Sequence, residues 1–286
     1  MCDQHTLEDE EDFLKASRRT FTVLTGAALA SLMAAPANAA EVAEEDVKIQ
    51  TPDGMADCYF VHPATGRRPA VIVWPDILGL RPAFRTMGKR LAQSGYSVLV
   101  VNPFYRKQPA PVVPDGASFS DPEVSKKVVP LMNSLTADGT KSDAIAFAAW
   151  VDKQKSVDTK KKMGTTGYCM GGPHVIRAAA AVPNRIGAGA TFHGASLATD
   201  KPDSPHLLIP SSKASYLMCI AQNDDMKDPA AKDKLRKICD ETKHKAEIEV
   251  YPANHGWCAL DFPVYDKAQA EKAWGRQLEL FKTSLV

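Results

Sequence analysis

From residue 70 onward, short hydrophobic runs alternate with longer stretches in which apolar residues recur at helical spacing. The hydrophobic runs are 71–74, 96–101, 163–166, 187–192, 216–221 and 246–251, and the helical stretches are 84–94, 142–153, 175–181, 230–242 and 266–285. Strands that helices cover on both faces are nearly continuous in Val, Ile, Leu and Ala. The alternation therefore predicts an α/β fold, a doubly wound and mostly parallel sheet flanked by helices.

One segment interrupts this alternation. Residues 108–135 include five prolines, which is typical of an irregular connection. Long irregular connections in a compact domain often line or cover a functional site. We therefore expect an irregular excursion here that caps a pocket.

The N-terminus has the pattern of an export signal. Ser-Arg-Arg-Thr-Phe at 17–21 precedes an apolar run at 23–35 and Ala-Asn-Ala at 37–39, a small-x-small cleavage site. The paired arginines resemble a twin-arginine signal, and an apolar run of about 13 residues is short of the roughly 20 that span a bilayer. We expect residues 1–39 to engage the export machinery and be removed. Residues 40–286 then form one periplasmic domain without stable membrane association.

Composition narrows the class of partner. The chain has 35 Lys plus Arg against 34 Asp plus Glu, a formal net charge of +1, which gives no strong field to attract nucleic acid. A small molecule is the expected partner. His255 and Cys258 have the spacing of a metal-ligand pair but no second pair, so the sequence predicts neither metal nor cofactor.

The cysteines have several possible roles. Five lie beyond residue 39, at Cys58, Cys169, Cys219, Cys239 and Cys258. An odd number leaves at least one outside any disulfide, and burial as a thiol is the default for the others. Their pairing stays open at this stage.

The densest chemical signal is Gly-Tyr-Cys-Met-Gly-Gly at 167–172, between a hydrophobic run and a helical stretch. A nucleophile elbow needs small residues two before and two after the reactive side chain, because the strand-to-helix turn is tight. The helix N-terminus lowers a thiol pKa and presents N–H groups to an oxyanion. The motif predicts Cys169 as a nucleophile, with a buried structural cysteine as the alternative.

Candidate partners for Cys169 follow in the order nucleophile, acid, base. The run 216–221 leads into Asp224 and Asp225, and the final run leads into a loop that contains His255. We predict His255 as the base and one of the two aspartates as the acid. His174 and His193 are further candidates for lining the pocket.

With these motifs in place, the chain resembles the dienelactone hydrolase family, the cysteine branch of the α/β-hydrolases. The resemblance rests on the elbow motif, on Trp-Pro-Asp-Ile-Leu-Gly-Leu at 74–80, on Asn-Pro-Phe-Tyr-Arg at 102–106 and on Asn-His-Gly-Trp at 254–257. It implies an α/β-hydrolase fold over residues 40–286. It also implies a carboxylic ester hydrolase that cleaves an ester or lactone through a thioester, without a cofactor.

The resemblance assigns roles to particular residues. It implies a thiol nucleophile at Cys169, a general base at His255 and an orienting carboxylate at Asp224. The backbone N–H groups of Met170 and Ile77 are the implied oxyanion hole.

Asp76 occupies the position of an acidic residue, commonly Glu, that contacts the resting thiol in this family and helps set its ionisation. The resemblance therefore implies a thiol-gating carboxylate at Asp76. A helix cap for the helical stretch that starts near residue 82 is the alternative.

One departure concerns the substrate. Family members that act on dienelactone have a carboxylate-binding arginine four residues after the histidine, where this chain has Ala259. Arg106, beside Tyr105, is another candidate cation, and Trp257 is a further candidate pocket residue. The resemblance therefore does not extend to specificity for an anionic lactone.

The same departure motivates a second interpretation, a non-catalytic periplasmic binding protein for small molecules on a hydrolase scaffold. An accessible thiolate is prone to oxidation in that compartment, and Cys258 is a candidate disulfide partner for Cys169.

Overall fold

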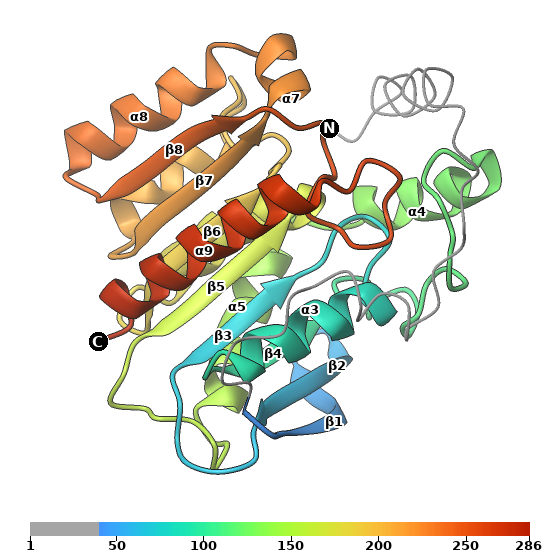
Figure 1. Ribbon diagram of the computed structural model, residues 1–286, viewed down its shortest axis with the longest axis vertical. Coiled ribbons are helices and arrows are strands. Elements are labelled where there is room, and N and C mark those ends of the chain that lie inside the picture. Colours follow the sequence, from blue (N-terminus) through green and yellow to red (C-terminus); the bar gives the residue numbers. More distant parts are fainter. Residues whose placement is uncertain (1–39) are drawn as a thin grey trace.

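The computed structural model describes residues 40–286, so the predicted signal peptide lies outside the described residues. A single eight-stranded sheet with the order β1-β2-β4-β3-β5-β6-β7-β8 runs through this part of the chain (Figure 1). The strands are β1 (Val42–Thr51), β2 (Gly54–Pro63), β3 (Ala70–Trp74), β4 (Ser97–Val101), β5 (Met163–Tyr168), β6 (Ile186–Phe192), β7 (Ser215–Ala221) and β8 (Ala246–Tyr251). β1 pairs with β2, and β2 with β4, in antiparallel fashion, and the other neighbours are parallel.

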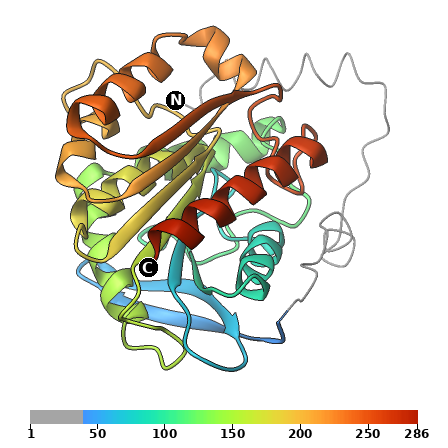
Figure 2. The same ribbon diagram turned by 60° about the vertical axis from the view of Figure 1, so that its left-hand side comes forward.

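Helices cover both faces of the sheet (Figures 1 and 2). One face packs against α3 (Pro82–Gln93) and α9 (Lys267–Ser284), and the other against α5 (Ala137–Val151), α6 (Gly172–Ala181) and α8 (Ala231–Thr242). The remaining elements are α4 (Pro122–Asn133), the short α7 (Gln222–Lys227) and the 3-10 helices η1 (Cys169–Gly171) and η2 (Pro205–Ser211). The predicted fold class is confirmed, since this is an α/β-hydrolase sheet with helices on both sides.

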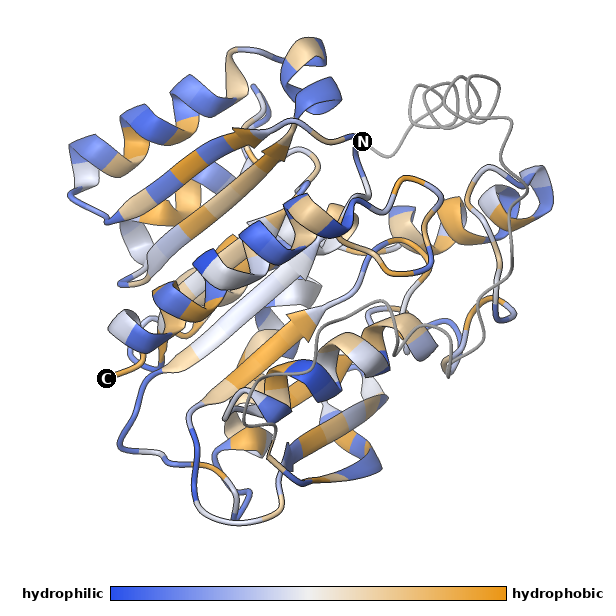
Figure 3. Ribbon diagram, in the orientation of Figure 1, coloured by the Kyte–Doolittle hydropathy of each residue, from blue (hydrophilic) through white to orange (hydrophobic). Residues whose placement is uncertain are grey.

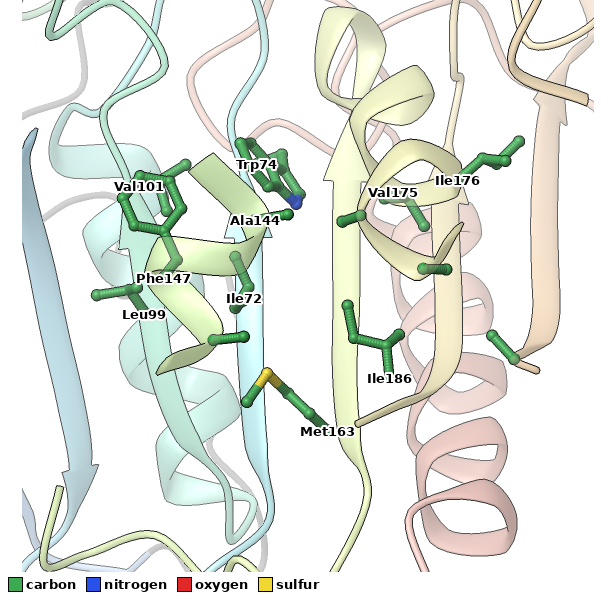
Figure 4. Close-up of a cluster of buried hydrophobic side chains, with 14 of the residues drawn as sticks. Ile72, Trp74, Leu99, Val101, Ala144, Phe147, Met163, Val175, Ile176 and Ile186 are labelled. Atoms are coloured by element: carbon green, nitrogen blue, oxygen red, sulfur yellow. The ribbon is translucent and has the colours of Figure 1, made fainter. Parts of the chain in front are cut away.

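Alternation along the strands builds two cores. In β3, Val71 and Val73 face α3, whereas Ile72 and Trp74 face the cluster under α5 and α6 (Figure 4). Each fully buried side chain of this size contributes about 1.5–3 kcal/mol of transfer free energy. Because β3 is covered on both faces, its residues are hydrophobic, whereas the outer helix α8 is mostly hydrophilic (Figure 3).

The structure corrects the sequence prediction in two places. The bounds of the β1–β2 hairpin were not predicted. β1 is an edge strand whose side chains are mostly exposed, which accounts for β1 but not for β2, whose side chains are mostly buried. The excursion at 108–135 is not irregular throughout, because it contains α4. Asp121 caps this helix by accepting a hydrogen bond from the Glu123 N–H (2.9 Å), and Pro122 occupies the first turn, where proline is tolerated.

Within residues 40–286, no helix combines the length and the apolar character that crossing a membrane requires.

Candidate active site

Cys169 lies at the turn between β5 and the η1–α6 segment, with a backbone φ of 51°. A positive φ is strained for a residue with a side chain and is the conformation expected at a nucleophile elbow. The flanking glycines are required by close contacts: a Cβ on Gly171 would lie 2.2 Å from the Trp74 carbonyl oxygen, and one on Gly167 would lie 2.2 Å from the Gly171 carbonyl oxygen. The G-x-C-x-G pattern therefore has a steric cause.

The carboxyl ends of the parallel strands bring three predicted residues together. His255, in the loop after β8, shares a hydrogen bond of 2.7 Å between its Nδ1 and Asp224 Oδ2 at the start of α7. The His255 backbone N–H donates to Asn223 Oδ1 (2.8 Å) and fixes the loop. The Cys169 sulfur and a ring nitrogen of His255 lie within 4.8 Å of each other. Cys169, His255 and Asp224 are thus brought together, and their roles as nucleophile, base and orienting acid stay predictions.

The two candidate aspartates have different partners. Asp225 forms an ion pair with Lys232, with 2.6 Å between Lys232 Nζ and Asp225 Oδ1. Asp224 is the aspartate in contact with His255. The structure therefore distinguishes two adjacent residues that the sequence left as alternatives.

Met170 and Ile77, the predicted oxyanion-hole residues, share a buried cluster with Cys169. Met170 follows Cys169 directly, and Ile77 follows β3, whose end packs against the elbow at Gly171. Their backbone N–H groups remain the predicted oxyanion hole.

Asp76 is completely buried and bound by an arginine. Arg81 Nη1 and Nη2 donate to Asp76 Oδ1 and Oδ2 at 2.6 and 2.9 Å, and the Leu78 N–H donates to Oδ1 at 2.9 Å. Arg81 also binds Asp261 through two hydrogen bonds of 2.6 and 2.8 Å. The N-cap of α3 is Arg81, so the alternative role of Asp76 as a helix cap is wrong. Its thiol-gating role stays a prediction.

Arg81 is a residue that the sequence reasoning missed. A charged side chain just after the apolar Ile-Leu-Gly-Leu segment was the available signal. Its guanidinium joins the loop after β3 to the loop after His255, and it packs over the rings of Phe84 and Phe262. Two loops that contribute to the site are therefore tied by one buried cation.

His193, at the end of β6, also reaches the centre of the site. Its ring is fully buried and meets the His255 ring edge-on at 4.9 Å between centroids and the Trp257 ring at 5.2 Å. Neither ring nitrogen of His193 has a hydrogen-bond partner in the described structure. Burial, with a smaller contribution from His255, holds the pKa of His193 well below its ordinary value and keeps the ring neutral.

Two cavities adjoin these residues. One of about 530 Å³ lies beside the loop after β6 and reaches Asp224 and His255. The other, of about 170 Å³, lies between α4 and α6 and is lined by Met170 and His174. His174 Nδ1 shares a 2.9 Å hydrogen bond with the Thr140 hydroxyl, and burial lowers the pKa of His174 to about 3.

The other predicted pocket residues have structural partners. Arg106 forms ion pairs with Asp143 and Asp53 at 2.7 and 2.6 Å, and the Tyr105 hydroxyl donates to Asp143 at 2.7 Å. Neither residue lines the two cavities above. Trp257 is fully buried, stacks on the Tyr251 ring and contacts His193. Arg106 and Tyr105 therefore anchor the loop after β4 to α5.

All five cysteines of residues 40–286 are buried thiols. Cys258 and Cys219 belong to the core beneath α9, whereas Cys169 belongs to the cluster beneath the 104–132 segment. Burial raises the pKa of Cys58, Cys219 and Cys258, which makes their thiolates unfavourable. The Cys169–Cys258 bridge of the second interpretation is not present.

The elbow and its histidine and aspartate, on this sheet, define an α/β-hydrolase. The profile of the Dienelactone hydrolase family matches residues 56–285, and the chain belongs to the dienelactone hydrolase family.

Individual relatives agree with this assignment. A candidate carboxymethylenebutenolidase of Escherichia coli (strain K12) is 29% identical over 226 residues, which cover 76% of this chain and 78% of that protein. The carboxymethylenebutenolidase of Rhodococcus opacus is 25% identical over 228 residues, which cover 78% of this chain and 84% of that protein. A crystal structure of a candidate dienelactone hydrolase from Klebsiella pneumoniae superposes with a TM-score of 0.73 at 23% identity, and covers 85% of this chain and 99% of that one. This last likeness concerns the fold.

Proposed function

We propose that the protein hydrolyses a small ester or lactone through a Cys169–His255–Asp224 triad. The observation that carries the proposal is the 2.7 Å contact between His255 Nδ1 and Asp224, with the Cys169 sulfur within 4.8 Å of His255 on a strained elbow. The family relatives named for carboxymethylenebutenolidase activity support a lactone or ester as the substrate class.

The first half-reaction forms a thioester. His255 accepts the Cys169 proton, and Asp224 stabilises the resulting imidazolium through Nδ1. The thiolate sulfur adds to the carbonyl carbon, and the oxyanion accepts hydrogen bonds from the Met170 and Ile77 N–H groups. Loss of one such donor costs about 3 kcal/mol of barrier. The C–O bond then breaks and His255 protonates the leaving oxygen, which stays attached to the acyl group if the substrate is a lactone.

The second half-reaction regenerates the thiol. His255 takes a proton from water, the hydroxide adds to the thioester carbonyl, and the C–S bond breaks as the proton returns to sulfur. The acid leaves and Cys169 is ready for another substrate.

Short aryl esters and lactones test the proposal on reduced protein. Cys169→Ala is expected to abolish hydrolysis, while Cys239→Ala, which removes a buried thiol of α8, is the matched control with activity retained. Rapid acid quenching and peptide mass spectrometry are expected to find the acyl group on Cys169. Unchanged turnover in Cys169→Ala would overturn the proposal.

We also propose that residues 1–39 direct export by the twin-arginine route and that the enzyme acts in the periplasm. The support is the Ser-Arg-Arg-Thr-Phe segment, the short apolar run and the Ala-Asn-Ala cleavage site.

A further inference from the structure

Three metal-ligating side chains converge at the elbow. Cys169, His193 and His255 each offer one sulfur or nitrogen atom, and the three atoms lie within 4.8 Å of one another. Zn²⁺ prefers Cys sulfur and His nitrogen in tetrahedral geometry, with bonds of about 2.0–2.3 Å, so that its ligand atoms lie roughly 3.5 Å apart. Small side-chain movements separate the observed cluster from that geometry.

We propose that Cys169, His193 and His255 form a reversible binding site for a thiophilic divalent ion of the Zn²⁺ type, and that its occupancy switches hydrolysis off. Binding stands on the cluster alone. The inhibitory half rests on the proposed function, because it requires Cys169 and His255 to be the nucleophile and the base.

His193 is the residue that singles out this site. The proposed hydrolysis gives it no role, yet its ring is fully buried and both nitrogens are without a hydrogen-bond partner in the described structure. A buried polar group without a partner costs about 1–3 kcal/mol, so such a group calls for a compensating role. A bound ion would satisfy one of the two nitrogens.

The surroundings of His255 match a metal-ligand pattern. Asp224 engages His255 Nδ1, which assigns Nε2 as the metal-binding atom and orients the ring. Metal-ligating histidines commonly pair their second nitrogen with a carboxylate in this way. A Cys169 thiolate and the Asp224 carboxylate together balance the two charges of the ion.

The binding step is an exchange without redox chemistry. The Cys169 S–H bond breaks, a sulfur–metal bond forms, and the proton passes to the buffer, while the two histidines bind through nitrogen lone pairs. Three protein ligands leave a fourth position for water. With sulfur and Nε2 both bound to the ion, neither a nucleophile nor a base is available, and a chelator restores both.

Two spectroscopic measurements test binding without any substrate. The reduced full chain is titrated with Zn²⁺ against a chromophoric chelator, and separately with Co²⁺, whose thiolate complexes show a near-ultraviolet charge-transfer band. We expect one ion per chain and a charge-transfer band that is absent in Cys169→Ala. His193→Gln is expected to weaken Zn²⁺ binding by more than the roughly 10–100-fold typical of an outer-shell partner. His174→Gln, at another buried histidine, is the control with unchanged affinity.

The outcomes separate the two halves. Equal Zn²⁺ affinity in wild type and His193→Gln, or no charge-transfer band in wild type, overturns the site. Should His193→Gln fail to fold, alkylation of Cys169 in the wild-type chain decides, because Zn²⁺ must protect this thiol and a chelator must remove the protection. Binding without loss of ester hydrolysis overturns only the switch, and an absence of ester hydrolysis in metal-free protein overturns the proposed function while leaving the site.

Discussion

Replacing Arg81 by methionine removes the cation that contacts both Asp76 and Asp261. The side chains of Arg81, Asp76 and Asp261 are 3%, 0% and 9% exposed, so water replaces little of the lost interaction. Methionine keeps much of the apolar volume and limits the cavity left behind. Breaking a buried ion pair by removing one partner costs about 3–5 kcal/mol. We expect Arg81→Met to lower the free energy of unfolding by this amount.

A matched control lies on α3, the helix that begins directly after Arg81. Arg85 pairs with Asp46, but these side chains are 38% and 72% exposed, and surface pairs contribute at most about 1 kcal/mol. Urea unfolding at pH 7, followed by circular dichroism at constant m-value, measures both variants. Adding Asp76→Asn and Asp261→Asn to Arg81→Met is expected to recover stability, since neutral amides need no counterion. Similar losses in Arg81→Met and Arg85→Met would refute the reasoning.

Arg81→Met is also expected to affect catalysis, through the loop that contains Ile77. Asp76 precedes Ile77, whose N–H is one of the proposed oxyanion donors. Without Arg81 the loop after β3 loses its anchor to the loop after His255. We therefore expect kcat for ester hydrolysis to fall more than KM rises.

Three further predictions concern other parts of the chain. Gly171→Ala places a Cβ 2.2 Å from a carbonyl oxygen of β3, so urea unfolding should show a loss of at least the roughly 1–3 kcal/mol typical of overpacking. Gly275→Ala in α9 has open space and should be neutral or stabilising. Burial lowers the pKa of His174 to about 3 in the folded protein. In the unfolded chain this histidine binds a proton below about pH 6.5, while in the folded protein it stays neutral. Lowering the pH from 7 to 5 should therefore reduce the free energy of unfolding by about 2 kcal/mol through this residue. Thermal melts of His174→Gln should show a flatter pH dependence, and an unchanged slope would contradict the assignment. The double substitution Arg18→Lys and Arg19→Lys should prevent export. Immunoblots should detect the wild-type protein, but not this variant, in the periplasmic fraction.

The sequence predicted the elements whose physics is local. The parallel strands are short and buried on both faces, so their hydrophobic runs are nearly continuous, and β5 to β8 appear close to where the runs lie. The elbow was predictable because close backbone contacts exclude a Cβ at its glycines, and this requirement is visible in the sequence as the G-x-C-x-G pattern. β1 has no continuous hydrophobic run in the sequence, because its acidic residues face solvent at the sheet edge. The helix α4 was not predicted because it contains Pro122 and Pro130, and prolines are typical of irregular segments.

Contacts between residues far apart in the chain could not be predicted from the sequence. Arg81 and Asp261 lie 180 positions apart, and nothing in either local pattern indicates their pairing. Asp224 and Asp225 are adjacent and chemically identical, so only the direction of α7 distinguishes the one that reaches His255. The sequence placed His193 at a strand end, but its contact with the His255 ring depends on how β6 and the loop after β8 meet.

Access to the elbow depends on the segment that covers it. Cys169 is 2% exposed and shares a buried cluster with apolar side chains of residues 104–132 and of the loops after β3 and after His255, so a substrate reaches the sulfur only when part of this cover moves. The loop after β4 is held by hydrogen bonds from Asn102 Nδ2 and the Ala110 N–H to Asp57, at 2.9 and 2.7 Å. α4 packs on this cluster through the buried Ser125 and Val128 and through four partly buried side chains, Val124, Val129, Leu131 and Met132. Exposing Val128 alone costs about 1.5–3 kcal/mol, and the partly buried α4 side chains add to this, so a displacement of α4 that opens the 170 Å³ cavity beside Met170 costs more than the exposure of Val128 alone.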